Sequence, residues 1–336
     1  MPIERRTKVT LKDLAHLCGV SLGTIDRAIN DKPGVSKKTR EMILRIAEEH
    51  GYRPNVIAQS LQSGKTFEIG LIVHDLNNRF FSLLVDSIQQ TAWEHHYYIQ
   101  LAVSLRDTTR EKEIIEHMLQ RNVDGILLFP TNVGETFYEY LVNLGIPVTL
   151  MANRVKGPPG SRPLPFIGLD NTTVVKQAVE QIIAQGYEVV NFVAPYFNTT
   201  NSHNYYEIDK RYQAFLSVVE VHTVEHHIFS CQQYRSEIAR LSFDKRTAFF
   251  CVSDIFALEL LSLFTEMGLA IPDDVGVMGF DNIDVLKYVR PSLSTINYPV
   301  SELGKQGFEL LHSTISGERV NPKQMLEAQI IWRDSI

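Results

Sequence analysis

The sequence predicts two folds in one chain: an all-α helix-turn-helix headpiece, followed by an α/β body made of two subdomains. Three observations predict this division. Two short, capped helical patterns flank a glycine turn within the first thirty residues, the charge balance changes sign near residue 65, and short apolar runs alternate with amphipathic segments from Phe67 onwards. A length of 336 residues leaves room for two or three domains.

The headpiece prediction depends on helix caps. Thr10 can cap a helix over residues 11–17, Asp13 can reach back to that cap, and Gly19 follows where a left-handed residue is wanted. Ser21 caps a second helix over residues 22–30. Two short helices around such a turn form a helix-turn-helix, whose second helix enters the major groove of DNA. The side chains expected to point outward from this helix are Leu22, Gly23, Asp26 and Arg27.

A third helix and a linker complete the amino-terminal part. Ser36 caps the third helix, which is expected to end at Gly51. Pro54 stops this element, and Asn55 can cap a fourth helix of about two turns, too short to be stable alone. We expect this segment to fold only when it is held against something. An apolar residue on it could wedge between base steps in the minor groove.

The charge distribution separates the same two parts. Residues 1–65 hold 12 Lys+Arg against 7 Asp+Glu, a balance of +5, whereas residues 66–336 hold the remaining 21 basic and 32 acidic residues, a balance of −11. A small basic domain joined to a large acidic one is typical of a DNA-binding head on a sensing body.

The headpiece resembles that of the LacI (lactose repressor)/GalR-type family of bacterial transcriptional regulators. The similarity covers Val9–Asn30, Val35–Arg40, Gly51–Asn55 and Ala58–Leu61, and it continues through the whole chain. It implies a lambda-repressor-like headpiece over residues 1–53 and a hinge over 54–66, with Leu61 entering the minor groove. The residues expected to bind DNA are Thr10, Ser21, Leu22, Gly23, Thr24, Asp26, Arg27, Asn30, Ser36, Arg53, Asn55, Ala58 and Leu61, and phosphate contacts are expected from Lys37, Lys38, Arg40 and Arg53.

Two positions of the second helix make the DNA sequence preference hard to transfer. Gly23 offers no side chain, and Asp26 stands where the family more commonly has serine. Asp26 could accept a hydrogen bond from a cytosine amino group or pair with a neighbouring lysine.

The body shows repeated β-α alternation, which predicts doubly wound parallel sheets. Ile69–Val73 and Gly125–Phe129 are expected strands of a first set, and a second set is expected to begin at Phe166. The resemblance implies a type I periplasmic-binding-protein-like body over 67–336, with crossovers near 164–166, 292–294 and 326–328. The amino-terminal subdomain is then 67–164 plus 293–326, and the carboxyl-terminal one is 165–292 plus 327–336.

Small molecules bind at strand carboxyl ends in such bodies, so the loops after the strands supply the candidate effector contacts. Arg79 replaces the proline of the family's Asn-Pro-Phe-Phe loop, and Arg211 resembles its ligand-holding arginine, whose planar fork suits vicinal hydroxyls or a carboxylate. Asp281 is expected to accept hydrogen bonds from the ligand, whereas Asp254 is equally well explained as a helix cap. The candidates are His74, Asn78, Arg79, Phe80, Ser104, Asn153, Arg211, Ser253, Asp254, Asp281 and Tyr298.

These features predict a homodimeric, sequence-specific DNA-binding regulator that recognises double-stranded operator DNA. We expect a repressor released by a small carbohydrate-like effector: a sugar, a sugar acid or a sugar phosphate. The additional Arg79, together with Ala152-Asn153 where the family often has an acidic or other polar residue, hints at an acidic effector. A regulator activated by a purine or other non-sugar corepressor is the alternative.

Other classes of protein fit the sequence less well. A solute-binding protein would explain the body but not the headpiece, and it would need an export signal. His222–His226 matches the H-x-x-E-H metalloprotease pattern, but its β-branched surroundings indicate a strand and not the required helix. No G-x-G-x-x-G follows the first strand, as a dehydrogenase would require. We expect a cytoplasmic protein, nucleoid-associated when bound to DNA, with no enzymatic activity, cofactor, metal or membrane partner, and with Cys18, Cys231 and Cys251 as small buried residues.

Overall fold

The computed structural model describes residues 9–53, 64–195, 197 and 203–336. The chain divides into two compact units, Met1–Thr66 and Phe67–Ile336. This division falls where the sequence predicts that the hinge ends and the body begins. The hinge residues Asn55, Ala58 and Leu61 lie outside the described residues.

The amino-terminal unit contains the predicted helix-turn-helix followed by a third helix. Its helices are α1 (Leu11–Cys18), α2 (Leu22–Ile29) and α3 (Lys37–Glu49). The side chains of Leu14, Ile25 and Ile43, one from each helix, are fully buried against one another. Gly19 has a φ of 61° after α1, so the turn requires the left-handed conformation that glycine adopts without strain. Leu17 of α1 lies outside this core and is 46% exposed.

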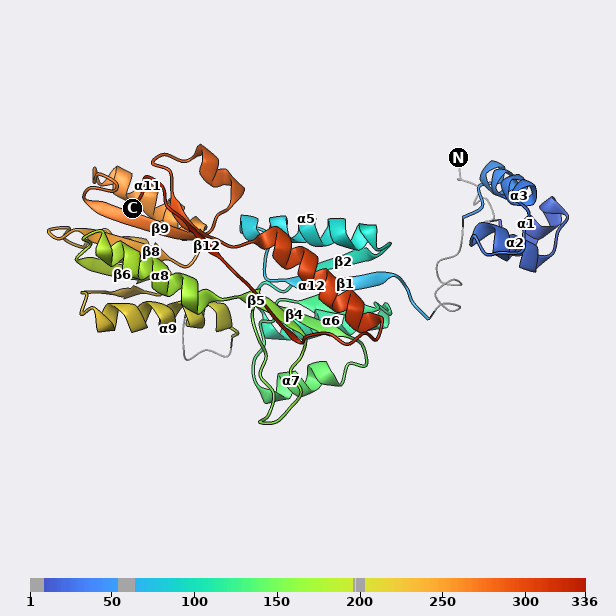
Figure 1. Ribbon diagram of the computed structural model, residues 1–336, viewed down its shortest axis with the longest axis horizontal. Coiled ribbons are helices and arrows are strands. Elements are labelled where there is room, and N and C mark those ends of the chain that lie inside the picture. Colours follow the sequence, from blue (N-terminus) through green and yellow to red (C-terminus); the bar gives the residue numbers. More distant parts are fainter. Residues whose placement is uncertain (1–8, 54–63, 196, 198–202) are drawn as a thin grey trace, which may run out of the picture. The chain divides into compact units, whose positions relative to one another are not determined.

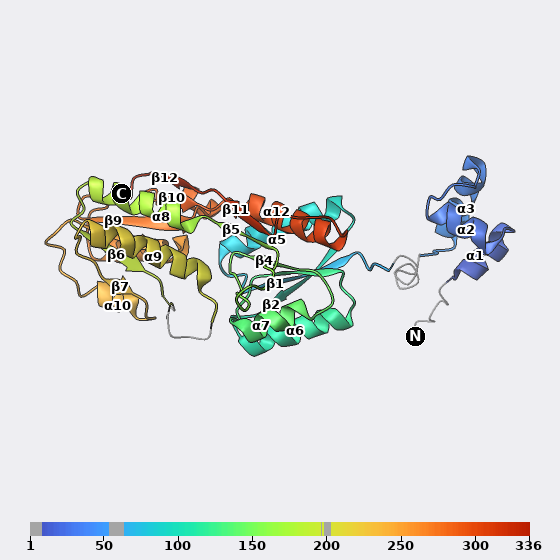
Figure 2. The ribbon, with the colours of Figure 1, turned by 60° about the horizontal axis from the view of Figure 1, so that its bottom comes forward.

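The body consists of two lobes, each built on a six-stranded sheet (Figures 1 and 2). The first lobe has strand order β11-β5-β4-β3-β1-β2, with every pairing parallel. Helices α5 and α12 pack together on one face of this sheet, while α6 and α7 cover the other. Its elements are β1 (Glu68–Val73), α5 (Arg79–Glu94), β2 (Tyr98–Val103), α6 (Thr108–Gln120), β3 (Gly125–Leu128), α7 (Glu135–Val142), β4 (Val148–Met151), β5 (Phe166–Leu169), α12 (Val300–Ile315) and β11 (Lys323–Leu326).

The second lobe has strand order β12-β10-β9-β8-β6-β7. All its pairings are parallel except that of β12 with β10, which is antiparallel. Its elements are α8 (Asn171–Ala184), β6 (Val189–Val193), α9 (Tyr206–Val221), β7 (Ile228–Phe229), α10 (Tyr234–Ile238), β8 (Thr247–Cys251), α11 (Asp254–Glu266), β9 (Val275–Asp281), the 3-10 helix η1 (Asp284–Tyr288), β10 (Ser294–Asn297) and β12 (Gln329–Ile331).

The chain crosses between the lobes three times, and two crossings differ from the sequence prediction. The strand β5 belongs to the first sheet, so the first crossing follows Leu169 and not residues 164–166. The strand β10 belongs to the second sheet, so the next crossing follows Asn297 and not residues 292–294. The third crossing lies between Leu326 and Gln329, near the predicted place. The first two predictions were wrong because an apolar run looks the same in either sheet, and only strand pairing assigns it.

The two sheets share one continuous hydrophobic core. Buried residues of β1, α5 and α12 in the first lobe and of α8, α9 and β8 in the second belong to the same cluster. Smaller clusters lie under α10 and α11 in the second lobe and under α6 and α7 in the first. None of the helices in the described part of the chain has the length and apolar character needed to cross a membrane.

Candidate functional site

The outer face of α2 carries the residues predicted to meet DNA bases. Ser21 caps the helix and its hydroxyl lies 2.9 Å from that of Thr24, so both polar side chains are occupied locally. Leu22 is 46% exposed, and Gly23 and Arg27 are also exposed. The exposed residues of α2 therefore present an apolar side chain at Leu22, backbone alone at Gly23 and a guanidinium at Arg27.

Asp26 adopts one of the two roles expected for it. Its carboxylate accepts a hydrogen bond from Lys32 Nζ at 2.9 Å and another from Asn30 Nδ2 at 2.7 Å. The Lys32 hydrogen bond holds the pKa of Asp26 below its usual value. The pairing with a neighbouring lysine neutralises a negative charge that would otherwise repel phosphates.

The cations expected to touch phosphates fall into two groups. Lys37, Lys38 and Arg53 are exposed and available to DNA. Arg40 is half-buried: its guanidinium pairs with Asp31 and donates to the carbonyl of Lys32 at 2.8 Å. Arg40 therefore holds the loop between α2 and α3, and the expectation that it contacts phosphate is not supported.

The predicted DNA contacts Thr10 and Ser36 lie at helix starts. Thr10 and Asp13 form a reciprocal capping box, with the Thr10 hydroxyl 2.7 Å from Asp13 Oδ2. Ser36 caps α3 through Thr39. Both capping side chains are exposed, so these helix starts remain accessible to a phosphate.

Arg211 is the centre of the polar groups buried in the body. It lies on α9 and is only 6% exposed. Its Nε donates to Asn171 Oδ1 at 2.8 Å, one terminal nitrogen donates to the carbonyl of Val252 at 2.7 Å, and the guanidinium lies 3.5 Å from the ring centroid of Phe280. These contacts fix the plane of the guanidinium, so it forms a rigid donor surface.

Glu207 completes this group, and the sequence analysis missed it. It precedes Arg211 by one helical turn, and its Oε2 lies 3.6 Å from the guanidinium and 2.5 Å from Asn171 Nδ2. Its other oxygen, Oε1, is buried and has no hydrogen-bonding partner among the described residues. Burial raises the pKa of Glu207 to about 7, although the Arg211 charge opposes the shift. The i, i+4 spacing of an acid and an arginine was the available signal.

Asp281 lies at the end of β9, close to the same arginine. Its Oδ2 accepts a hydrogen bond from the Ser253 hydroxyl at 2.9 Å, and its backbone φ of 118° is one that residues other than glycine rarely adopt. Burial, aided by the negative charge of Asp254, raises the pKa of Asp281 to about 8, against the attraction of Arg211. A strained backbone and a buried carboxyl group are typical of a binding position.

Asp254 has a structural role different from the helix cap expected for it, because Ser253 is the N-cap residue of α11 and Asp254 is the first residue of that helix. Its carboxylate accepts from the Thr295 hydroxyl at 2.6 Å and from the backbone N–H of Ile283 at 2.9 Å, and the residue is fully buried. A side chain on Gly279 would collide with this carboxylate, because an added Cβ would lie 2.2 Å from Asp254 Oδ1. Asp254 therefore fastens the start of α11 to β10 and to the loop after β9.

An aromatic group from the first lobe lies beside these polar residues. The ring of Phe80 contacts those of Phe129 and Tyr298, whose centroids lie 6.4 and 5.1 Å away. The Tyr298 ring also contacts Phe280, under Arg211. The Tyr298 hydroxyl is buried without a partner among the described residues, and burial raises its pKa well above the usual value.

His74 follows β1 and lies beyond the same aromatic group. Its ring contacts Phe81 and Phe129, and its Nε2 is buried without a partner in the described part of the chain. Burial lowers its pKa well below the usual value, and the positive charge of Arg106 adds to this shift. His74 is therefore a neutral side chain with an unused polar atom.

The remaining candidates have local roles. Ser104 is buried, 3.3 Å from both the Val73 carbonyl and the Thr131 hydroxyl, and Asn78 caps α5 by accepting from the Phe80 N–H at 3.0 Å. Asn153 connects the lobes: its Nδ2 donates to the Asn204 carbonyl at 3.2 Å.

Arg79 differs from expectation. It is half exposed and forms a two-point ion pair with Asp284 across the lobes, 2.9 Å at each contact. An effector-facing role for Arg79 is not supported, because the guanidinium already has its carboxylate partner.

No cluster in the described residues suggests a metal centre. No group of three or more His, Cys, Asp or Glu side chains there could hold a metal ion. The H-x-x-E-H pattern does not lie on a helix: His222 ends α9, Glu225 forms a bridge with Val189, and His226 precedes β7. Of the three cysteines, only Cys251 is fully buried, since Cys18 and Cys231 are half-buried.

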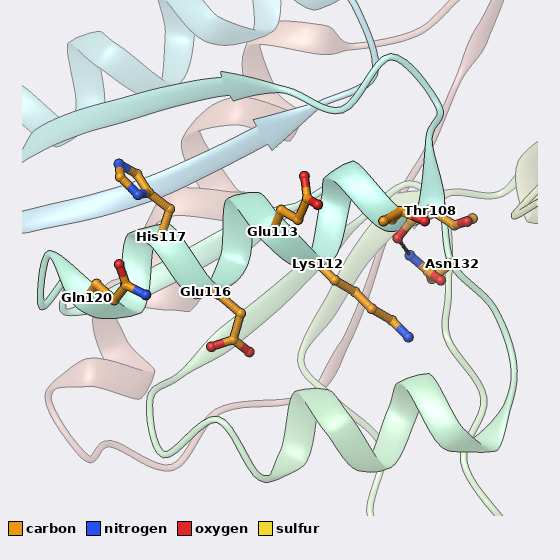
Figure 3. A pocket seen from close by; sticks show the side chains of 8 residues that line it. Thr108, Lys112, Glu113, Glu116, His117, Gln120 and Asn132 are labelled. Carbon is orange, nitrogen blue, oxygen red and sulfur yellow. Dashed lines mark hydrogen bonds between the residues drawn. The ribbon is translucent and has the colours of Figure 1, made fainter.

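A surface pocket of about 460 Å³ lies on α6, outside the group around Arg211. Figure 3 shows Lys112 and Glu116 extending to one side of α6, and Glu113 and His117 to the other. At one end of this pocket, the Asn132 side-chain amide donates a hydrogen bond to the Thr108 carbonyl at 2.7 Å. These side chains are mixed in charge and show no convergence on a ligand.

Comparison with known proteins agrees with both parts of this structure. Residues 10–55 match bacterial regulatory proteins of the lacI family, and residues 179–336 match the periplasmic binding protein-like domain. Catabolite control protein A of Priestia megaterium is 30% identical over 319 residues, which cover 93% of this chain and 94% of that protein. The chain belongs to the lacI family.

Two further relatives extend the comparison. The HTH-type transcriptional repressor PurR of Vibrio campbellii is 30% identical, with 97% of this chain and 98% of that protein covered. The crystal structure of the lac repressor dimer bound to operator and the anti-inducer ONPF has the same fold, with a TM-score of 0.83, 20% identity, and coverage of 98% of this chain and 99% of that chain. This lacI-family protein is a DNA-binding transcriptional regulator with a body of the effector-binding type.

Proposed function

We propose that this regulator is a repressor whose affinity for operator DNA changes when a small neutral, hydroxyl-rich molecule binds between the lobes. The observation that carries the proposal is the set of buried polar atoms without partners around Arg211. They are Glu207 Oε1 and Tyr298 Oη, and His74 Nε2 lies beyond the adjoining aromatic group. A buried polar atom without a partner is costly, so such atoms in one region point to a ligand that satisfies them.

Charge in this region favours a neutral ligand over an acidic one. Arg211 already faces Glu207, and Arg79, the additional arginine noted in the sequence, is paired with Asp284. Neither Arg211 nor Arg79 is therefore an unmatched cation that would support the acidic effector suggested by the sequence. The free Glu207 oxygen calls for a hydrogen-bond donor, which a sugar hydroxyl supplies.

The aromatic group leaves one alternative chemistry. Phe80, Phe129, Phe280 and Tyr298 offer rings that could pack against the apolar face of a sugar or against a flat heterocycle such as a purine. A purine or a similar flat heterocycle is therefore the second candidate for the effector. A direct comparison of sugars with nucleobases and nucleosides decides between the two.

We also infer a homodimer formed through the first lobe. The strand β2 is an edge of its sheet and exposes Tyr98 (58%) and Leu101 (40%), and Leu105 (59%) is exposed in the turn that follows. Trp93 of α5 packs against Tyr98. An apolar sheet edge of this kind is protected in nature by a partner. The lac repressor in the comparison is also a dimer, which supports the dimeric state. Sedimentation equilibrium of a Leu101→Asp variant tests it, since the charge should yield a monomer.

The proposed signal passes through the attachment of the hinge. Phe67, the first residue of the body, donates its N–H to Asp124 Oδ2 at 3.0 Å, accepts from the Tyr98 N–H at 2.9 Å and packs on the Tyr97 ring. A shift of the first lobe therefore moves the start of the hinge. A ligand can bias such a switch only by its different affinity for the two states, commonly about 1–3 kcal/mol of coupling.

The test combines ligand and DNA binding on the full-length protein. Thermal unfolding is measured with sugars, sugar acids, sugar phosphates, nucleosides and purines, and an operator is selected from random duplex DNA. A true effector should raise the unfolding temperature increasingly with concentration and should change operator affinity in a fluorescence anisotropy titration. Weaker DNA binding indicates an inducer, and tighter binding a corepressor.

The matched control is Asp281→Asn. This variant should bind DNA as the parent does but lose the ligand response. If no compound changes operator affinity, or if the variant still responds fully, the proposed effector site is wrong.

A further inference from the structure

The ion pair between Arg79 and Asp284 connects two parts of the body that must separate when the lobes open. Arg79 begins α5 in the first lobe, and Asp284 begins η1 in the second. The Nε–Oδ1 and terminal nitrogen–Oδ2 distances are both 2.9 Å, so the guanidinium and carboxylate meet fork to fork. This two-point geometry is the strong and directional form of an arginine–carboxylate contact.

Both partners are held in place by their own lobe. The hydroxyl of Ser82 lies 3.3 Å from the Arg79 guanidinium, and Asn78 caps the helix that Arg79 begins. On the other side, the N–H of Ile283, the residue before Asp284, donates to the buried carboxylate of Asp254. Less conformational entropy is lost on pairing when each partner is already positioned.

The pair is also close in sequence to residues of the proposed effector site. Arg79 is adjacent to Phe80, whose ring packs on Tyr298, and Asp284 follows Asp281 by three residues. Within the intervening segment, Asn282 is tied to Asn297 at 3.0 Å and to Arg333 at 2.8 Å. Breaking the ion pair should therefore shift Phe80 in the first lobe and Asp281 in the second, because each is joined to the pair by a short, hydrogen-bonded segment.

We propose that Arg79 and Asp284 form a clasp that holds the two lobes closed and thereby positions the effector-binding residues. The part of this proposal that concerns effector binding rests on the proposed function. The part that concerns lobe closure does not, because the ion pair can hold the lobes together without a ligand. Closure itself has a local signature. The N–H of Asn204 in the second lobe donates to the Thr131 carbonyl of the first at 2.8 Å, and the N–H of Glu207 donates to Asn153 Oδ1 at 3.2 Å.

The test measures hydrogen–deuterium exchange of these two amides in the ligand-free, full-length protein. The variants are Arg79→Ala, Asp284→Ala and the double charge swap Arg79→Asp with Asp284→Arg. In each single variant, the amide hydrogens of the peptide containing residues 203–207 should exchange about two- to fivefold faster than in the parent. This is the range expected from the loss of an exposed ion pair. The charge swap should restore much of the protection.

Two controls make the result specific to the clasp. Lys245→Ala removes an exposed ion pair with Glu225 that lies wholly within the second lobe, so exchange at residues 203–207 should not change. Salt at 0.5 M should accelerate exchange in the parent but not in Arg79→Ala, because it screens the pair. Unchanged exchange in both single variants, no recovery in the swap, or an equal effect of Lys245→Ala would each overturn the clasp. None of these outcomes depends on whether an effector has been identified.

Discussion

Glu207 lies one turn before Arg211 on α9, and its Oε2 is 3.6 Å from the Arg211 guanidinium, with both side chains buried. A buried arginine needs this counter-charge, since an isolated ion is costly to remove from water. The pair leaves one glutamate oxygen free while the guanidinium is held flat on Phe280. One helix thus supplies both a donor and an acceptor to the region between the lobes.

Arg211→Lys should behave as a severe change although it keeps the positive charge. A lysine cannot donate to Asn171 and to the Val252 carbonyl in one plane while it also stacks on Phe280. We expect a stability loss of about 1.5–3 kcal/mol, the usual value for a hydrogen bond to a charged group. Chemical denaturation measures this loss. Lys210→Arg, the neighbouring position on the same helix, is the control and should change little.

The buried carboxyl groups of Asp281 and Glu207 should stabilise the effector-free protein less as pH rises from about 4 to about 8. The pKa of Asp281 in the folded protein is about 8, raised mainly by burial, whereas in the unfolded chain it is near its ordinary value of 3.8. Between these values the folded state holds a proton that the unfolded state has lost, so the free energy of unfolding falls with increasing pH. Glu207, with a pKa of about 7, acts in the same direction.

Asp281→Asn should flatten this dependence because asparagine does not titrate. The unfolding temperature measured between pH 5 and pH 9 should then fall less steeply in the variant than in the parent. At pH 8 to 9 the variant should be at least as stable as the parent. Equal slopes in the two proteins would show that the Asp281 carboxyl group is not buried as described.

Asp254→Ala should destabilise the body even in the absence of any ligand. It leaves the buried N–H of Ile283 and the hydroxyl of Thr295 without their acceptor. A group left unsatisfied in this way costs about 1–3 kcal/mol. Urea denaturation checks this, with exposed Asp244→Ala as the comparison. If Asp254→Ala kept parental stability but lost the ligand response, Asp254 would be a ligand contact after all.

Two arginines of the headpiece should affect different properties when replaced by alanine. Arg27 is exposed on α2, so Arg27→Ala should weaken operator binding, and if it contacts a phosphate the salt slope should fall by about one unit. Arg40 is engaged by Asp31 and the Lys32 carbonyl, so Arg40→Ala should lower headpiece stability while the salt slope stays close to that of the parent. Anisotropy titrations at several salt concentrations, together with thermal unfolding, separate the two outcomes.

Local signals were sufficient for most of the fold. The caps Thr10, Ser21 and Ser36 begin the three headpiece helices as predicted. The strands β1 and β3 lie at the apolar runs expected to form strands. Among the site residues, Arg211 and Asp281 were predicted and are buried close together. Helix α12 was not predicted, although its packing against α5 is the largest helix–helix contact of the first lobe.

The sequence by itself determined the order of the elements, the helix-turn-helix and the two-lobed body, because caps and hydrophobic periodicity are properties of neighbouring residues. Only the tertiary structure decided which sheet contains β5 and β10, since hydrogen bonding between distant strands assigns them. It also decided the partners of charged groups. Arg79 pairs with Asp284, which is 205 residues away in the chain, and Arg40 pairs with Asp31. The Asp254 carboxylate accepts hydrogen bonds from Thr295 and Ile283. The energy of a charge depends on its surroundings in space, and chain positions alone do not specify them.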